Sequence, residues 1–279
     1  MKITIAKSAG FCFGVKRALQ ISLKTATSKK NAYMLGDIVH NEDVVSRIRK
    51  AGIKKIKKIG RGNAKTLLIR AHGAPLDTIK KAKRCGYRIV DATCPMVKEI
   101  HRIAARMERL GYKIIIIGDK KHDEVQGIMG QLKGKAIVIH DLKTIPINII
   151  SKIKKAAVVV QSTQNLDKVS KIVDVLNKTV EKTEFFNTIC RPTRIKQQEI
   201  KKLPLKNEVI IIIGSKTSAN TKRLYEIAKN LNTRSYWVQS KRDLKPSWFK
   251  DIRNVGVTAG ASTPDSTTKE VVERIKEIA

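Results

Sequence analysis

Short runs of apolar residues, each ending in a glycine and a group of polar residues, alternate along the chain with longer segments of helical periodicity. Three of these runs resemble one another: AYMLGDIVHNEDV at 32–44, IIIIGDKKHDEV at 114–125 and IIIIGSKTSAN at 210–220. The first two share the pattern G-D-x-x-H, which gives His40 and His122 equal spacing from the preceding glycine. Recurrence of one pattern in this way indicates an internal structural repeat.

Two further strand patterns recur in the same three repeats. One ends in small polar residues, in LLIRAHGAP at 67–75, AVVVQSTQ at 157–164 and VGVTAGASTPD at 255–265. These strands place the following residues in comparable positions: His72, Ser162 with Thr163, and Ser262. The other leads into a cysteine, at Cys94, at Cys190 and, displaced to the N-terminus, at Cys12. Each repeat therefore has one strand that leads into a cysteine.

The segments between these strands have apolar residues at i, i+3 and i+4, which predicts helices at 97–111, 166–178 and 221–231. Alternation of strands with helices indicates an α/β fold with parallel sheets. We predict three small α/β lobes in a pseudo-threefold arrangement, formed by residues 13–93, by 94–189, and by 1–12 with 190–279. Binding residues of parallel sheets lie at the carboxyl ends of the strands, so the polar motifs are expected to line one central cavity.

The chain is strongly basic, with 58 Lys and Arg against 24 Asp and Glu and a net charge of +34. Such a charge favours phosphate-rich partners, including nucleic acid. The basic residues are dispersed along the whole chain rather than gathered in one arm, which favours a generally basic surface. The longest apolar runs have the length of buried strands, and the first residues lack a signal-peptide pattern, so we expect a cytoplasmic protein without membrane segments.

Four cysteines are present, and their spacing excludes the paired motifs of zinc ribbons and attached haem. Cys12, Cys94 and Cys190 come from three different repeats, which fits an iron-sulfur cluster better than a structural zinc ion. A four-iron cluster with three cysteine ligands keeps one iron open to water or a substrate oxygen. For any single cysteine, the alternative is a small residue of the core. Cys85 is interpreted in that way, as a buried or half-buried thiol.

Imidazoles, hydroxyls and amides suit a buried diphosphate, whose oxygens each need a hydrogen bond. The candidates are His40, His72, His122, Ser218, Asn220 and Ser262. Ser218 and Asn220 precede a predicted helix, where an N-cap role is the alternative. Glu124 is two residues beyond His122 and is a candidate proton donor, the alternative being a solvated acid. His101 and His140 have no counterpart in the other repeats, and we predict surface or capping roles for them.

The ordered motifs G-F-C-F-G-V, V-H-N, R-A-H-G, D-A-T-C-P, H-D-E-V-Q-G, N-T-I-C, G-S-K-x-S-x-N and V-T-A-G-A-S-T-P-D cover nearly the whole chain. In this set the sequence resembles the 4-hydroxy-3-methylbut-2-enyl diphosphate reductases of the non-mevalonate isoprenoid pathway. The resemblance implies three α/β lobes around a central 4Fe-4S cluster on Cys12, Cys94 and Cys190, with the substrate hydroxyl on the unique iron. It also implies reductive dehydroxylation to isopentenyl and dimethylallyl diphosphate.

The same resemblance implies roles for the polar residues. The diphosphate would be held by His40, His72, His122, Ser218, Asn220 and Ser262. Protons would be managed by Glu124 with the hydroxyls of Ser162 and Thr163, and His122 is counted with Glu124 and Thr163 as catalytic. Electrons would come from a ferredoxin or flavodoxin, and neither a membrane nor a specific nucleic acid is an expected partner.

The chain departs from the usual family pattern at a few positions. Ala219 stands where the family usually has a second serine, which removes a hydroxyl unless the backbone N–H of Ala219 serves. Ser162 occupies a position where the family usually has threonine. In the segment after N-T-I-C, Ile195 and Lys196 replace the more usual asparagine and arginine, so the resemblance does not specify the contacts of these two residues.

Two other functions remain compatible with parts of the sequence. A polyanion-binding or RNA-associated protein would explain the charge, and its affinity would fall steeply with salt without depending on the cysteines. A non-catalytic redox sensor would explain the cysteines but would not need Glu124.

Overall fold

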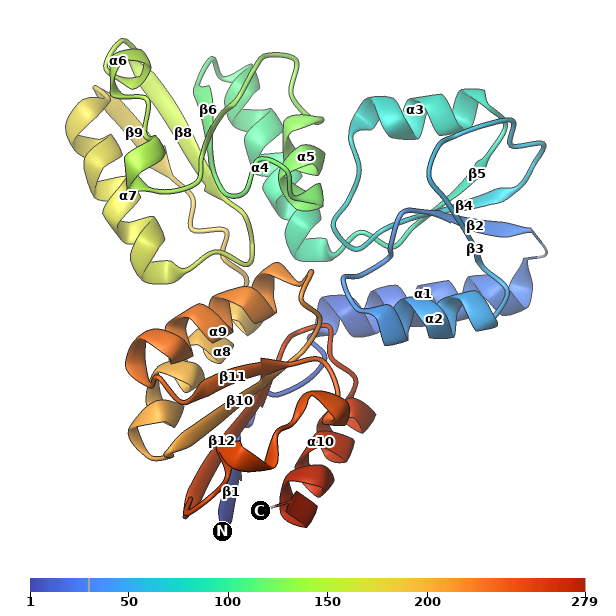
Figure 1. The fold of residues 1–279 in the computed structure, drawn as a ribbon. Coiled ribbons are helices and arrows are strands. Elements are labelled where there is room, and N and C mark those ends of the chain that lie inside the picture. Colours follow the sequence, from blue (N-terminus) through green and yellow to red (C-terminus); the bar gives the residue numbers. More distant parts are fainter. Residues whose placement is uncertain (30, 279) are drawn as a thin grey trace. The chain divides into compact units, whose positions relative to one another are not determined.

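The computed structural model describes residues 1–29 and 31–278. Its strands form three four-stranded sheets, and all the neighbouring strands in them run parallel (Figure 1). The strands are β1 (Lys2–Ile5), β2 (Ala32–Leu35), β3 (Lys54–Ile56), β4 (Thr66–Ile69), β5 (Arg88–Asp91), β6 (Lys113–Ile117), β7 (Ile137–Ile139), β8 (Lys155–Val160), β9 (Lys182–Phe185), β10 (Val209–Ile213), β11 (Ser235–Val238) and β12 (Asn254–Ala259). The parallel α/β class predicted from the sequence is confirmed.

Most of the crossover connections between the parallel strands contain a helix. The helices are α1 (Phe13–Ser28), α2 (Glu42–Lys50), α3 (Leu76–Arg84), α4 (Pro95–Arg109), α5 (Asp123–Met129), α6 (Ile147–Ile150), α7 (Leu166–Thr179), α8 (Arg191–Lys202), α9 (Ala219–Leu231) and α10 (Asp265–Ile278). No helix of the described residues is both long enough and apolar enough to span a bilayer.

The three sheets share one strand order. Two of them run β3-β2-β4-β5 and β7-β6-β8-β9, so that the first strand of each segment lies between the second and the third. The remaining sheet runs β11-β10-β12-β1, and the N-terminal strand takes the place of the fourth strand. This confirms that the strand before Cys12 completes the third repeat.

The chain divides into two compact units. Unit 1 comprises residues 1–16, 39–47 and 191–279 and contains the sheet of β1, β10, β11 and β12; unit 2 comprises 17–38 and 48–190 and contains the other two sheets. Each of the three predicted lobes supplies one complete sheet, while the lobe boundaries and the pseudo-threefold arrangement stay predictions.

Sheets buried on both faces explain why the longest apolar runs are continuous. In β6, Ile115 and Ile117 pack with residues of α7, whereas Ile114 and Ile116 pack with residues of α4 and α5. In β10, Ile211 and Ile213 pack against α10, and the alternate isoleucines pack against α8 and α9. Each fully buried isoleucine contributes roughly 1.5–3 kcal/mol, so the central strands are firmly fixed and their carboxyl ends form stable supports.

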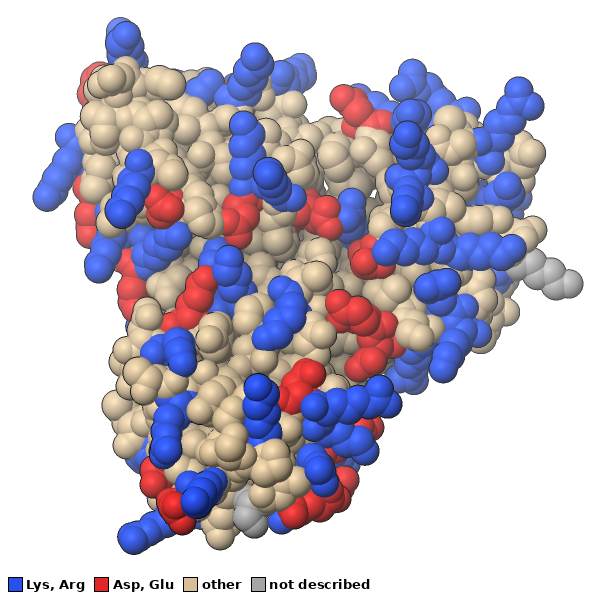
Figure 2. All heavy atoms as spheres, viewed as in Figure 1, with Lys and Arg blue, Asp and Glu red and all other residues tan. Residues whose placement is uncertain are grey.

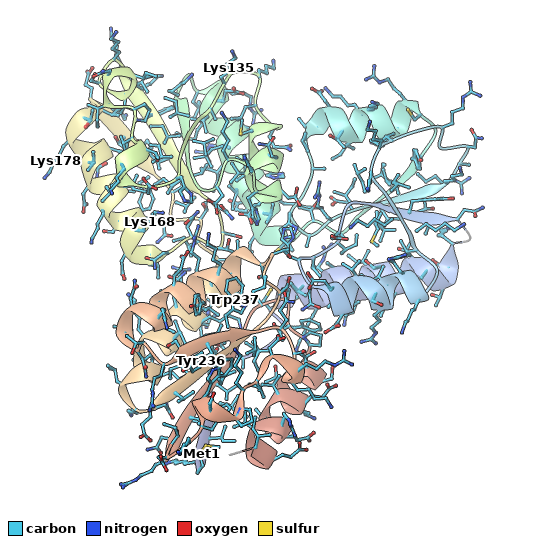
Figure 3. All side chains as sticks on the ribbon, in the orientation of Figure 1. Met1, Lys135, Lys168, Lys178, Tyr236 and Trp237 are labelled. Carbon is cyan, nitrogen blue, oxygen red and sulfur yellow. The ribbon has the colours of Figure 1, made fainter. Side chains whose placement is uncertain are left out.

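The edge strand β11 was not among the repeated strand patterns of the sequence. Its adjacent aromatic residues, labelled in Figure 3, face opposite sides of the sheet because side chains alternate along a strand. Tyr236 stacks on Trp248 with ring centroids 3.9 Å apart. Trp237 donates from Nε1 to the carbonyl of Gly214 at 2.8 Å, and Lys216 lies over its ring. The strand thereby holds the turn that follows β10.

Candidate active site

Every candidate residue lies just beyond the carboxyl end of a strand. The first strands of the three sheets lead to His40, to His122 with Glu124, and to Ser218 with Asn220. The third strands lead to His72, to Ser162 with Thr163, and to Ser262. The fourth strands lead to Cys94, Cys190 and Cys12. Carboxyl ends of parallel strands are where α/β proteins bind ligands.

The three cysteines have the same backbone setting. Each is followed at once by a helix, since α1, α4 and α8 begin at Phe13, Pro95 and Arg191. The cysteine N–H groups donate to carbonyls that follow the third strand of each sheet: Cys12 to Ala261 at 3.0 Å, Cys94 to Ala71 at 2.9 Å and Cys190 to Ser162 at 3.1 Å. All three are half-buried and free of disulfides.

This setting fits metal ligands. The N-terminus of a helix carries a partial positive charge, which stabilises a thiolate, and the thiolate is the form that binds iron. Soft thiolates are the donors that iron-sulfur clusters require. Two predicted helices begin two residues earlier than expected: α4 begins at Pro95 rather than at residue 97, and α9 begins at Ala219 rather than at residue 221.

The same hydrogen bonds define which residues are equivalent among the repeats. The acceptor carbonyls belong to Ala261, Ala71 and Ser162, and the next residues are Ser262, His72 and Thr163. Thr163 is therefore the counterpart of His72 and Ser262, and Ser162 has a different role. Its carbonyl binds the Cys190 amide, and its N–H and hydroxyl contact Glu124.

Glu124 is a buried carboxyl with two defined partners. It is 1% exposed; its Oε1 accepts from the Ser162 N–H at 2.5 Å, and its Oε2 accepts from Ser162 Oγ at 2.8 Å. Burial raises the pKa of Glu124, against the lowering effect of both Ser162 hydrogen bonds. A carboxyl with a raised pKa can hold a proton closer to neutral pH, which is the property of a general acid.

His122 is the N-cap of α5 and not only a neighbour of Glu124. Its Nδ1 accepts from the Glu124 N–H at 3.1 Å, so the neutral ring carries its hydrogen on Nε2. The His72 ring meets His122 edge to face, with centroids 5.5 Å apart. Arg70 and Asp123, from the same two loops, form an ion pair. Unit 2 therefore brings His72, His122, Glu124 and Ser162 together.

Unit 1 brings together a second set of polar residues. The hydroxyl of Ser262 donates to the carbonyl of His40 at 2.9 Å. Ser218 is the N-cap of α9, and its Oγ accepts from the Thr221 N–H. The alternative role predicted for Ser218, helix capping, is therefore confirmed. Asn220 is 5% exposed, and its Nδ2 has no hydrogen-bond partner among the described residues. Its amide is thus available to a ligand.

Ala219 is the first residue of α9. The N–H groups of the first turn have no acceptor within the helix. The backbone N–H of Ala219 is therefore placed as a donor beside Ser218 and Asn220, although the hydroxyl of the usual serine is missing.

One of the two histidines without a counterpart in the other repeats differs from its sequence prediction. The surface or capping role predicted for His101 is wrong: its ring is packed against the glycines at 73 and 127, and desolvation by burial lowers its pKa from 6.5 to about 4. Asp91 opposes this shift. The surface role of His140 is correct, since its side chain is 43% exposed and paired with Asp119. Cys85 is half-buried, as predicted.

Lys196 was noted only as a departure from the family pattern, and its surroundings could not be predicted. It is 2% exposed, whereas the neighbouring Ile195 is 37% exposed. The charged side chain is thus buried and the apolar side chain is exposed, the opposite of what their polarities predict. Desolvation lowers the pKa of Lys196 to about 8, against the opposing effects of Cys12, Glu199 and Asp265. Gln161 was also missed: it is fully buried and binds the Asp119 N–H and the Thr163 hydroxyl.

Fold and site define an α/β protein of three repeated parallel sheets, with one cysteine directly before a helix for each sheet and polar residues at the strand ends. The family model described as "LytB protein" matches residues 3–276, and the chain belongs to this family.

Curated relatives are similar over their full length. The chain is 40% identical over 282 residues to the 4-hydroxy-3-methylbut-2-enyl diphosphate reductase of Geobacter metallireducens, covering 100% of this chain and 98% of the relative. It is 39% identical to that of Aquifex aeolicus, covering 99% and 96%.

Two solved structures are also similar. A structure of (E)-4-hydroxy-3-methyl-but-2-enyl diphosphate reductase, described as the terminal enzyme of the non-mevalonate pathway, has a TM-score of 0.71 at 37% identity and covers 99% of this chain and 100% of that chain. The structure of the E-1-hydroxy-2-methyl-but-2-enyl-4-diphosphate reductase from Plasmodium falciparum has a TM-score of 0.89 at 27% identity, covering 97% and 86%.

Proposed function

We propose that this chain is a 4-hydroxy-3-methylbut-2-enyl diphosphate reductase, an oxidoreductase of the non-mevalonate isoprenoid pathway. The reductase activity follows from membership of the LytB family and from relatives of that name at about 40% identity over the full length. The observation that carries the site is the shared setting of Cys12, Cys94 and Cys190, each at a helix N-terminus and each bonded through its N–H to the loop after a third strand.

The three thiolates would hold one 4Fe-4S cluster. When bound, the cluster supplies electrons and one iron without a cysteine ligand, which acts as a Lewis acid toward the substrate hydroxyl. In the overall reaction the allylic C–O bond breaks, two electrons and two protons enter, one proton leaves with the oxygen as water, and the other is added to carbon to give isopentenyl or dimethylallyl diphosphate.

The polar residues divide into two tasks. His40, His72, Ser218, Asn220 and Ser262 would bind the diphosphate, together with His122 and the N-terminus of α9. Glu124 would deliver the protons, because it is buried and its pKa is raised. Ser162 holds both oxygens of Glu124, and Thr163, the counterpart of His72, would act with Ser162 and His122 beside the reacting hydroxyl.

The electron donor would be an acidic ferredoxin or flavodoxin. Figure 2 shows Lys and Arg side chains spread over the visible face, with acidic side chains between them. Dispersed positive charge attracts an acidic carrier electrostatically, and it argues against one specific nucleic-acid surface. The location would be the reducing cytoplasm, where thiols stay reduced, and the four cysteines form no disulfide among the described residues.

Anaerobic purification followed by Mössbauer spectroscopy, with and without the hydroxylated allylic diphosphate, tests this proposal. We expect a four-iron cluster with one iron site whose signal changes when substrate is added. A protein that holds no iron after reconstitution would overturn the proposal and favour the polyanion-binding alternative. A cluster whose signals ignore substrate would favour the redox sensor.

A further inference from the structure

Lys196 is a buried cation that fastens the segment leading to Cys12. Its ammonium donates to the carbonyls of Ser8, of Gly10 at 3.0 Å and of Ala259 at 2.9 Å. An ammonium has three N–H groups, so these three acceptors satisfy it completely. Ser8 and Gly10 lie between β1 and Cys12, and Ala259 is the last residue of β12.

Glu199, one helical turn after Lys196 in α8, also binds the segment between β1 and Cys12. Its Oε2 accepts from the Ser8 N–H at 2.9 Å and from the Ser8 hydroxyl at 2.5 Å. The segment is also held at Cys12, whose N–H donates a hydrogen bond to the carbonyl of Ala261. Helix α8 begins immediately after Cys190, which is one proposed cluster ligand. Through Lys196 and Glu199 the same helix binds the segment that leads to Cys12, a second proposed ligand.

A buried ammonium also acts through its charge. Removing a cation from water costs several kcal/mol unless it is compensated, and here the compensation comes from three carbonyls and from the nearby carboxylates of Glu199 and Asp265. Positive charge close to a cluster ligand stabilises the reduced, more negative state of a cluster, since net charge and hydrogen bonding set its potential.

We propose that Lys196 is a positioning residue for the cluster: it fixes the Cys12 segment and, as a buried positive charge beside that cysteine, raises the reduction potential of the bound cluster. This inference rests on the proposed function, because it requires a cluster on Cys12.

The test compares Lys196→Met, which keeps the length of the side chain without its charge, with Lys196→Arg, which keeps the charge. Lys202→Met is the control, since Lys202 is an exposed residue of the same helix. Iron content, the unfolding temperature of the apoprotein and the midpoint potential from an anaerobic redox titration are measured for each protein.

We expect a more negative midpoint potential and a lower iron content for Lys196→Met, recovery of the potential in Lys196→Arg, and wild-type values for Lys202→Met. Equal potentials in the wild type and in Lys196→Met would overturn the inference and leave the proposed function intact. A wild-type protein without a cluster would instead overturn the proposed function.

If Lys196→Met does not fold, Glu199→Gln gives a second test with the opposite sign. This change removes a negative charge from the same region and keeps an acceptor for Ser8, so the midpoint potential should rise. A fall or no change would overturn the electrostatic part of the inference.

Discussion

At the scale of single residues, the site depends on polar groups that are buried with specific partners. Glu124 has both oxygens occupied by Ser162, and His122 accepts the Glu124 N–H while it caps α5. These bonds fix the position of the carboxyl and keep its proton away from bulk water. Glu124, the proposed proton donor, is therefore held by backbone and side-chain hydrogen bonds together.

Glu124→Gln should reduce turnover by about 100-fold or more, the usual contribution of a positioned proton donor. An amide cannot deliver a proton, but it preserves the size of the side chain, so iron content should not change. Steady-state kinetics under anaerobic conditions, together with iron analysis, measure both. Glu181→Gln, at an exposed acid, is the matched control. Full activity of Glu124→Gln would exclude the proton-donor role.

His101 should make the protein sensitive to acid. Its pKa in the folded state is about 4, below the ordinary 6.5, so its contribution to stability is complete above pH 6.5 and is lost as the pH falls toward 4. At about 1.4 kcal/mol per pH unit, the difference between 6.5 and about 4 corresponds to a loss of at most about 3.5 kcal/mol.

Urea denaturation at several pH values checks this expectation. His101→Gln should flatten the decrease in the free energy of unfolding between pH 7 and 4 relative to the wild type. Parallel profiles for His101→Gln and wild type would show that another group causes the acid sensitivity.

At the scale of elements, helix ends position the chemistry. α5 carries Glu124 near its N-terminus, and its C-cap, Gly130, packs on Pro75, the N-cap of α3. The Leu76 N–H donates to the Gly130 carbonyl at 3.0 Å. The loop after His72 and the helix that carries Glu124 are thus in direct contact, and there is no space for a side chain at Gly130.

Gly130→Ala tests this junction, because a Cβ at this position would overlap with the Cβ of Pro75. Overpacking of this kind costs about 1–3 kcal/mol, which urea denaturation should detect. In Gly60→Ala the new Cβ would have no neighbour within 4 Å, and the free energy of unfolding should stay within about 0.5 kcal/mol of wild type. Equal stability of the two variants would contradict the close contact.

At the scale of the whole molecule, the dominant property is the net charge of +34. It is spread over many exposed side chains, so its effect on an incoming acidic protein is long in range and is screened by salt. A carrier that docks on such a surface gains association rate rather than a tightly specified orientation.

Reduction of the protein by an acidic ferredoxin should slow by roughly tenfold between 50 and 500 mM salt, because electrostatically steered association falls steeply with ionic strength. Stopped-flow absorbance measures the rate. Reduced methyl viologen, a small cation, is the control, and its rate should stay constant or increase with salt. Insensitivity of the ferredoxin rate would argue against an electrostatically guided donor.

The sequence by itself determined the repeats, the parallel α/β class and the positions of the strand ends. It could do so because burial on both faces of a parallel sheet produces continuous apolar runs, and the polar residues that follow them mark the carboxyl ends. The cysteine of each repeat could be identified in the same way, even where β1 is separated from its sheet by about 200 residues of chain.

Only the tertiary structure decided how the polar residues are used. The burial of Lys196 depends on acceptors 63 to 188 positions away in the sequence, and the burial of His101 depends on Gly73, in the loop after β4, and on Gly127 of α5. The choice of Thr163 rather than Ser162 as the counterpart of His72 depends on the hydrogen bond from Cys190. Local periodicity specifies where a strand ends, but the free energy of burying a polar group is set by partners that only the folded chain brings into contact.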